Sequence, residues 1–213
     1  RQKMMTYLRN GIGIPAYGGF IPKGLPGYDD SIGFSYQPEK AKQLIEQYKA
    51  ETGNTNPAIT ITTTSNYLSF CEYIQRELQK TGLEVIVDVI PASSLKDSKA
   101  NGKLDMFRAS WIADYPDAEN YLSLYFSKNF APNGPNYTHY KNDLFDSWYE
   151  ATFSETDPKQ REILYTKMDS LVMASAPVVP LFYDEVVRFT RKEVKGLGIN
   201  PVNLLELKRV SKW

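Results

Sequence analysis

Apolar residues recur at helical spacing in several stretches of the chain, and shorter β-branched stretches lie between them. Pro38 opens a helical pattern whose apolar face comprises Ala41, Leu44, Ile45 and Tyr48. The predicted helices of this first half span 38–50, 67–80 and 93–101, and the predicted strands span 57–64, 83–90 and 103–111. Strands that alternate with helices in this way predict a parallel α/β unit with right-handed crossovers.

The second half of the chain is predicted to be helical first and extended afterwards. Asp157-Pro158 marks a helix start, because Asp caps the first backbone N–H groups and Pro fits the first turn. The predicted helices span 141–154 and 158–175, and the predicted strands span 176–183, 186–190 and 204–210. The chain opens inside a helical pattern at residues 1–9 with no capping residue ahead of it, so we expect a piece of a longer protein.

Two Gly- and Pro-rich segments, residues 10–37 and 128–140, interrupt these elements. Tyr and Phe are interleaved with the Gly and Pro of residues 10–37, whereas a flexible linker is rich in Gly and Ser and poor in aromatics. We therefore expect residues 10–37 to be an ordered loop on the surface, either a binding loop or a structural wrap.

Composition removes several classes of function. The chain has 25 basic and 25 acidic residues, so no net charge favours nucleic acid or an anionic membrane. One Cys and one His exclude a disulfide framework and a Cys or His cluster for zinc, and no phosphate-binding glycine loop occurs. No apolar run reaches the roughly 18 residues of a membrane span. We expect no metal or cofactor, and we expect Cys71 to be packed on a helix.

The stretch from Trp111 to Asp117 is the strongest candidate for a binding site. Asp114 lies where the third predicted strand gives way to a loop and then a helix, and Pro116 prevents the strand from continuing. Ligands of open α/β sheets bind outside the carboxyl ends of strands, so Asp114, between Trp111 and Tyr115, could pair with a cation on a small ligand. The alternative is that Asp114 or Asp117 only caps the following helix.

Two further interpretations concern the same region. Arg108 lies on the strand before Asp114 and would mark a second point along an elongated ligand, unless it pairs with Asp105 or Asp88. A carboxylate-dependent hydrolase using Asp114 and Asp117 is the alternative function, although two carboxylates from one short loop seldom flank a substrate from both faces.

Residues 107–122, Phe-Arg-Ala-Ser-Trp-Ile-Ala-Asp-Tyr-Pro-Asp-Ala-Glu-Asn-Tyr-Leu, resemble the signature of a known family. It is the peptide-type (family 5) extracellular solute-binding proteins of ABC importers, the oligopeptide- and dipeptide-binding group. Three more segments resemble the family in the same order: 15–22 (Pro-Ala-Tyr-Gly-Gly-Phe-Ile-Pro), 136–142 (Asn-Tyr-Thr-His-Tyr-Lys-Asn) and 176–183 (Ala-Pro-Val-Val-Pro-Leu-Phe-Tyr). Each motif alone is loose, but together they extend the resemblance over nearly the whole chain.

The resemblance implies an α/β fold, a periplasmic-binding-protein-like lobe with a mixed sheet flanked by helices. Family members are longer and close two lobes on a buried ligand, so this chain would be a C-terminal fragment. Residues 1–184 would be the second ligand-binding lobe, with its N-terminal part missing. Residues 185–213 would be a return segment that belongs to the first lobe of the full-length protein.

The resemblance also assigns roles to particular residues. Asp114 would hold the α-amino group of the ligand, with Trp111 and Tyr115 lining the cleft beside it. Arg108 would receive the carboxyl end of longer peptides. Asn66 would face the cleft from the start of the helix after the first strand, unless it only caps that helix.

The implied function is capture of short peptides and their delivery to an ABC permease, without catalysis. The full-length protein would be periplasmic or at the cell surface, anchored to the membrane as a lipoprotein through an N-terminal signal, and the fragment itself would be monomeric. The family also includes binders of nickel, haem and sugars, so the fold alone does not name the ligand. Asp114 favours a ligand that carries an amine.

Overall fold

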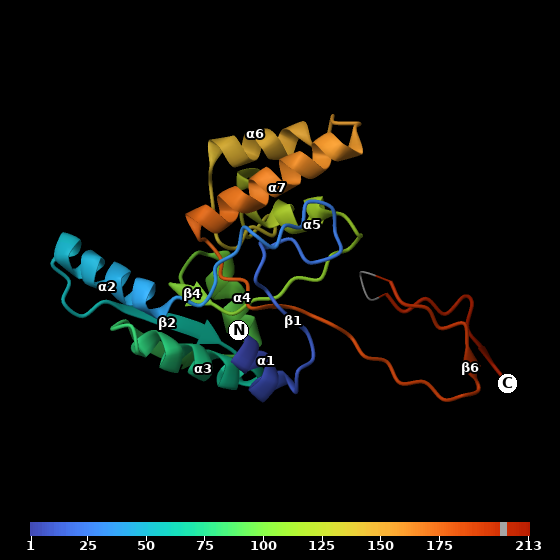
Figure 1. Cartoon of the computed structure of the whole chain (residues 1–213), viewed down its shortest axis with the longest axis horizontal. Helices are drawn as coiled ribbons and strands as arrows, with labels where there is room; N and C mark the ends of the chain where they lie inside the picture. The colour runs from blue at the N-terminus through green and yellow to red at the C-terminus, as the bar shows by residue number, and fades with distance from the viewer. Residues whose placement is uncertain (201–203) are drawn as a thin grey trace.

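The computed structural model describes residues 1–200 and 204–213, which form an α/β layer, a helical layer and an extended C-terminal arm (Figure 1). The α/β layer contains a three-stranded sheet in the order β3–β2–β4. β2 (Ala58–Thr63) pairs in parallel with β3 (Glu84–Val89) along its whole length, and in parallel with β4 (Met106–Phe107) at two positions. The predicted parallel α/β unit is confirmed.

The third strand is much shorter than the predicted span 103–111, and that prediction was wrong. The backbone N–H of Arg108 still donates to the carbonyl oxygen of Thr62, over 3.2 Å. Beyond Arg108 the chain bonds to the helical layer instead, and the indole Nε1 of Trp111 donates to Oδ1 of Asn120 over 2.8 Å. The strand therefore ends well before Asp114, which lies within a loop and not at the strand end.

The helix α3 (Leu68–Gln79) covers one face of the sheet, and α4 (Ala92–Ala100) connects β3 to β4. Cys71 of α3 is fully buried against Ile61 and Val85, as expected for a packed cysteine.

The helix α2 (Pro38–Thr52) forms as predicted but buries none of its residues. Leu44 and Tyr48, from the face predicted to be apolar, are 51% and 45% exposed. Figure 1 shows α2 standing out at the left edge of the molecule. The predicted helix is therefore confirmed, and much of its apolar face is exposed in this chain.

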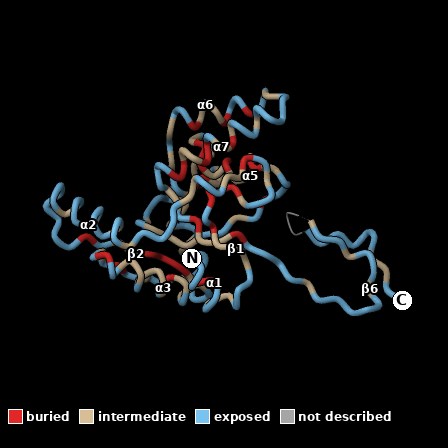
Figure 2. Tube along the Cα trace, viewed as in Figure 1, coloured by how far each residue is buried: buried red, intermediate tan, exposed pale blue. Residues whose placement is uncertain are grey.

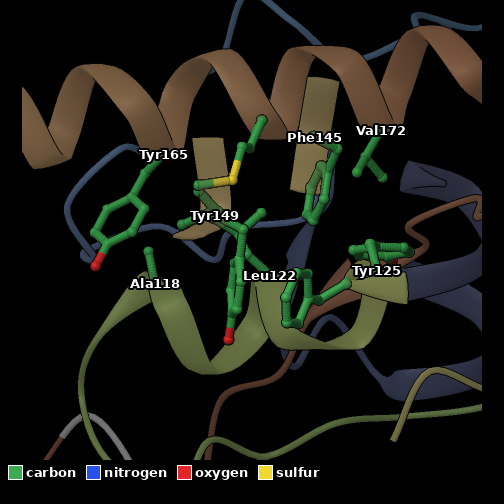
Figure 3. Packing of buried hydrophobic residues seen from close by; sticks show 10 residues of the cluster. Ala118, Leu122, Tyr125, Phe145, Tyr149, Tyr165 and Val172 are labelled. Atoms are coloured by element: carbon green, nitrogen blue, oxygen red, sulfur yellow. The ribbon is translucent and has the colours of Figure 1, made fainter. Parts of the chain in front are cut away.

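The helical layer consists of α5 (Ala118–Leu122), the 3₁₀ turns Ser123–Tyr125 and Ser127–Asn129, α6 (Asp143–Ala151) and α7 (Pro158–Ser175). The Asp157 side chain accepts a hydrogen bond from the backbone N–H of Lys159, so the predicted cap is confirmed. The main core lies between α5, α6 and α7 and is the larger of the two cores (Figure 3). Its buried residues are Ile21, Ala118, Leu122, Tyr125, Phe126, Phe145, Tyr149, Tyr165, Met168 and Val172.

Residues 10–37 form an ordered loop that is tied to the helical layer. The buried carboxylate of Asp169 on α7 accepts hydrogen bonds from the backbone N–H groups of Phe20 (2.7 Å) and Ile21 (3.1 Å). The Ile21 side chain enters the main core. This loop therefore acts as a structural wrap, one of the two roles expected for it.

The N-terminal helix α1 (Gln2–Arg9) leads into β1 (Ile14–Pro15), which pairs antiparallel with β5 (Phe182–Tyr183). The strand predicted over 176–183 is thus reduced to its last two residues.

After Tyr183 the chain leaves both layers as an arm (Figures 1 and 2). Its short strands β6 (Val194–Lys195) and β7 (Ser211–Lys212) pair antiparallel with each other. In the part of the chain that the structure describes, neither 186–190 nor 204–210 forms a strand, so both of these predictions are wrong. Among the described residues, no helix has the length and apolar character that crossing a membrane requires.

Candidate functional site

The carboxyl ends of β2 and β3 form the floor of the candidate site. The connections that leave them run to α3 and α4, and in the order β3–β2–β4 these two crossovers run in opposite directions along the sheet. Right-handed crossovers that run in opposite directions leave a sheet on opposite faces, and open α/β sheets bind ligands at the strand ends where this happens. An open pocket of about 400 Å³ lies there. It is lined by Thr64, Ser65, Asn66, Val89, Ile90, Pro91 and Ala92.

Asn66 belongs to this pocket and is exposed. It lies in the 3₁₀ turn Ser65–Tyr67 between β2 and α3, and neither that turn nor α3 has a side-chain cap. The alternative that Asn66 merely caps the helix is therefore wrong.

Arg108 lies next to the same turn. Its guanidinium carbon is 3.4 Å from the centre of the Tyr67 ring, a cation–π contact that fixes the side chain in place. Within residues 1–200 and 204–213, Arg108 forms no ion pair, and Asp105 instead accepts the backbone N–H of Thr60 over 3.2 Å. The alternative pairing of Arg108 with Asp105 or Asp88 is therefore wrong. A guanidinium has five N–H donors, so most of them are available to an anionic group.

The loop between β4 and α5 carries the other three predicted residues. Trp111 is half-buried, whereas Asp114 and Tyr115 are exposed. The side chain of Asp114 has no hydrogen bond or ion pair with any residue that the structure describes. Its carboxylate is therefore available to a cation, as the binding hypothesis requires.

Asp117, in contrast, is fully engaged by the protein. Its carboxylate accepts the backbone N–H of Glu119 over 3.0 Å, which makes it the cap of α5, and it forms an ion pair with Arg161 of α7 over 3.1 Å. The capping alternative is thus correct for Asp117 and wrong for Asp114. A hydrolase that pairs Asp114 with Asp117 has no support, because Asp117 is committed to the helix and to Arg161.

Sequence reasoning missed two residues of this region, Glu119 and Asn120. The Glu119 carboxylate accepts hydrogen bonds from the hydroxyls of Tyr115 and of Tyr149 on α6. The bond to Glu119 raises the pKa of Tyr115, and burial raises the pKa of Tyr149. Asn120 is buried and bonds to the Trp111–Asp114 segment. In the sequence, both look like ordinary residues of a short helix.

The structure therefore brings the five predicted residues into two groups. Asn66 and Arg108 meet at the 3₁₀ turn after β2, and Trp111, Asp114 and Tyr115 are gathered around α5. Among the described residues, no group of three or more His, Cys, Asp or Glu is placed to hold a metal ion.

Comparisons with known proteins agree with this architecture. The sequence profile of the family described as "Bacterial extracellular solute-binding proteins, family 5 Middle" matches residues 1–133, more than half of the chain. The "Di/tripeptide-binding protein 4" of Pseudomonas aeruginosa is 29% identical over 91% of this chain. The "Dipeptide-binding protein DppE" of Bacillus subtilis is 30% identical over 81% of it. The chain spans only 37% and 32% of the lengths of these two relatives.

A solved structure gives the same result. The "ABC transporter-associated periplasmic binding protein DppA from Helicobacter pylori in complex with peptide STSA" superposes with a TM-score of 0.82 and 26% sequence identity. The superposition covers 99% of this chain and 41% of that protein. The matched profile includes all five predicted site residues, and these relatives are binding proteins by name and not enzymes. The chain therefore belongs to the bacterial extracellular solute-binding proteins of family 5.

Proposed function

We propose that the chain is the C-terminal part of a receptor that captures short peptides and delivers them to an ABC permease. The observation that carries the proposal is the exposed Asp114 carboxylate, which has no partner among the described residues and stands beside Trp111 and Tyr115. Relatives named for dipeptides and tripeptides, and one solved with a bound peptide, support a peptide as the ligand.

Asp114 would bind the α-ammonium group of the peptide. An ammonium that loses its water on domain closure is costly unless a carboxylate pairs with it, so a carboxylate enclosed with the ligand selects for a free amine. Trp111 and Tyr115 would supply apolar surface around this pair and exclude water from it.

Arg108 and Asn66 would bind the ligand further along. Arg108 stacks on Tyr67 with most of its donors unused, which suits it to the terminal carboxylate of a longer peptide. Asn66, at the mouth of the open pocket, can both donate to and accept from a peptide backbone. Backbone hydrogen bonds of this kind give affinity that does not depend on the side chains of the ligand.

The domain organisation follows from the same proposal. Residues 1–184 would be the second ligand-binding lobe, and residues 185–213 would return to the first lobe, which this chain lacks. The exposed apolar side chains of the arm support this, because an arm that rested on another lobe would bury them. Hinge closure of the two lobes would then be the signal that the permease detects.

The full-length protein would act outside the cytoplasm, in the periplasm or at the cell surface. We propose that an N-terminal signal or lipid anchor holds it at the membrane and that the 1–213 chain alone is monomeric. We also propose that it binds its ligand without chemical turnover, since its relatives carry the names of binding proteins.

The test is Asp114→Asn in the full-length protein, with titration calorimetry against trialanine. Breaking a desolvated charge pair should weaken binding by about 2–5 kcal/mol. Asp117→Asn is the matched control, because it lies in the same segment and keeps an acceptor for the helix cap. It should change the affinity less than about threefold. Equal affinity of wild type and Asp114→Asn would remove Asp114 from the site.

A further inference from the structure

The loop that carries Trp111, Asp114 and Tyr115 has no regular secondary structure of its own. It lies between β4, which ends at Phe107, and α5, which begins at Ala118. A loop of this kind lacks the hydrogen bonds of a helix or a sheet. Its backbone and polar side chains therefore take a defined geometry only if another element supplies partners for them.

One buried side chain supplies these partners. Oδ1 of Asn120 accepts a hydrogen bond from the indole Nε1 of Trp111 over 2.8 Å and a second from the backbone N–H of Asp114 over 3.3 Å. Two of the three predicted site residues of the loop thus bond to the same amide oxygen, and the hydroxyl of the third, Tyr115, bonds to Glu119, the neighbour of Asn120 in α5.

The position of Asn120 is itself fixed by packing. Ala118 and Leu122, on either side of it in α5, are fully buried in the main core, and Asn120 is only 6% exposed. Figure 3 shows Ala118 and Leu122 pointing from α5 towards α7. The amide therefore projects from a short helix whose flanking side chains are fully buried in the main core, which fixes the place of its bonds to the loop.

A neutral amide suits this place better than a carboxylate. Its oxygen accepts from two donors without adding a negative charge beside Asp114. A carboxylate would accept the same two bonds, but it would compete with Asp114 for the ammonium of a ligand.

We propose that Asn120 is the positioning residue of this binding site, which holds Trp111 and Asp114 in the geometry that receives an amine. The inference rests on the proposed function for the amine. The claim that Asn120 fixes the loop can be tested without any ligand.

The test compares three variants of the full-length protein. Asn120→Leu removes both acceptor bonds, Asn120→Asp keeps them, and Asn136→Leu is the matched control. Asn136 is likewise a buried asparagine, in a loop, but it bonds to Phe126, Thr138 and Tyr140 and to none of the predicted site residues. If Asn120→Leu does not fold, Asn120→Ser is the second variant, because it is small, polar and too short to reach both donors.

The first measurement is hydrogen exchange of the Asp114 amide and the Trp111 indole without ligand. In Asn120→Leu both should exchange at least about tenfold faster, whereas Asn120→Asp and Asn136→Leu should stay within about threefold of wild type. Unchanged exchange in Asn120→Leu would overturn the proposal, because the loop would then hold its shape without the amide. So would an equal acceleration in Asn136→Leu, which would indicate a general loss of stability.

The second measurement is the ratio of affinities for trialanine and N-acetyl-trialanine. Wild type should prefer the free amine, and Asn120→Leu should reduce this preference at least about tenfold, while Asn136→Leu preserves it. A preference that Asn120→Leu leaves intact would overturn the role of Asn120 in positioning Asp114. If wild type itself shows no preference, the amine site of the proposed function fails, and the exchange measurement still decides whether Asn120 fixes the loop.

Discussion

The helical layer and the C-terminal arm contain similar apolar side chains in opposite environments. Phe145 in the helical layer is fully buried and contacts the rings of Tyr125 and Tyr149, whereas Phe189 and Trp213 in the arm are 95% and 88% exposed. Figure 2 shows the same contrast along the whole trace, with buried segments in the layers and an arm that is mostly exposed. Apolar character alone therefore does not bury a residue, because a packing surface must also be present.

The loop of residues 10–37 shows what the arm lacks. It has equally little secondary structure, but Asp169 binds its backbone at two points and Ile21 enters the main core. The arm makes its regular backbone pairing within itself, between β6 and β7. In our proposal, the first lobe of the full-length protein provides the surface that the arm needs.

The largest expected effect concerns the buried ring of the helical layer, compared with an exposed ring of the arm. Phe145→Ala removes a fully buried ring and leaves a cavity, so it should lower the free energy of unfolding by about 3–5 kcal/mol. Phe189→Ala in the same 1–213 chain should change it by no more than about 0.5 kcal/mol, because its ring is almost entirely exposed. Urea unfolding followed by circular dichroism measures both.

The full-length protein extends this test to the proposed role of the arm. There, Phe189→Ala should cost about 2 kcal/mol or more, since the ring would be buried against the first lobe. If Phe189→Ala has the same small effect in both proteins, this side chain does not pack on the first lobe.

The contrast also explains which parts of the fold could be predicted from sequence. The α/β unit follows from local sequence, since residues 57–64 alternate as a strand does, residues 83–90 are rich in Val and Ile, and residues 67–80 repeat as a helix does. Predictions that needed a distant partner strand were wrong. The segments 186–190 and 204–210 have strand-like local patterns but form no strand among the described residues.

The candidate site divides in the same way. Asp114, Trp111 and Tyr115 could be selected because they lie in one short motif after a strand. Asn120 could not, because a polar residue in a short helix normally faces water, and its burial and its bonds to Trp111 and Asp114 are visible only in the folded chain. The stacking of Arg108 on Tyr67 could not be predicted either, because the two residues follow different strands of the sheet.

An intermediate effect concerns Asp169, which binds the loop of residues 10–37 and so distinguishes that loop from the arm. Burial raises the pKa of Asp169 from its ordinary value of 3.8 to about 6, although the bonds from Phe20 and Ile21 lower it. The folded chain thus holds this proton more tightly than the unfolded chain does. The contribution of Asp169 to stability should be greatest below about pH 4, should fall by about 2–3 kcal/mol as the pH rises through about 6, and should stay level above about pH 7.

Asp169→Asn isolates that contribution, because an amide does not titrate. The free energy of unfolding of wild type should drop relative to the variant between about pH 4 and pH 7, and urea unfolding at each pH measures the difference. If the free energies of unfolding of wild type and Asp169→Asn change in parallel with pH, the pKa of Asp169 does not change on folding. The contribution of Asp169 to stability would then not depend on pH.

The smallest effect is expected at the junction between the two layers and the C-terminal arm. Arg9 forms an ion pair with Asp184 and also lies 4.5 Å from the centre of the Phe182 ring. The Asp184 side chain is 63% exposed, so water and salt screen the pair, and Asp184→Ala should cost no more than about 1 kcal/mol. The loss should disappear in about 1 M salt, where the Debye length is only about 3 Å. Urea unfolding of the 1–213 chain at low and high salt measures it. A loss that persists at high salt would mean that Asp184 is held by more than its charge. Asp184 would then belong to the packed layers, and the arm would begin further along the chain.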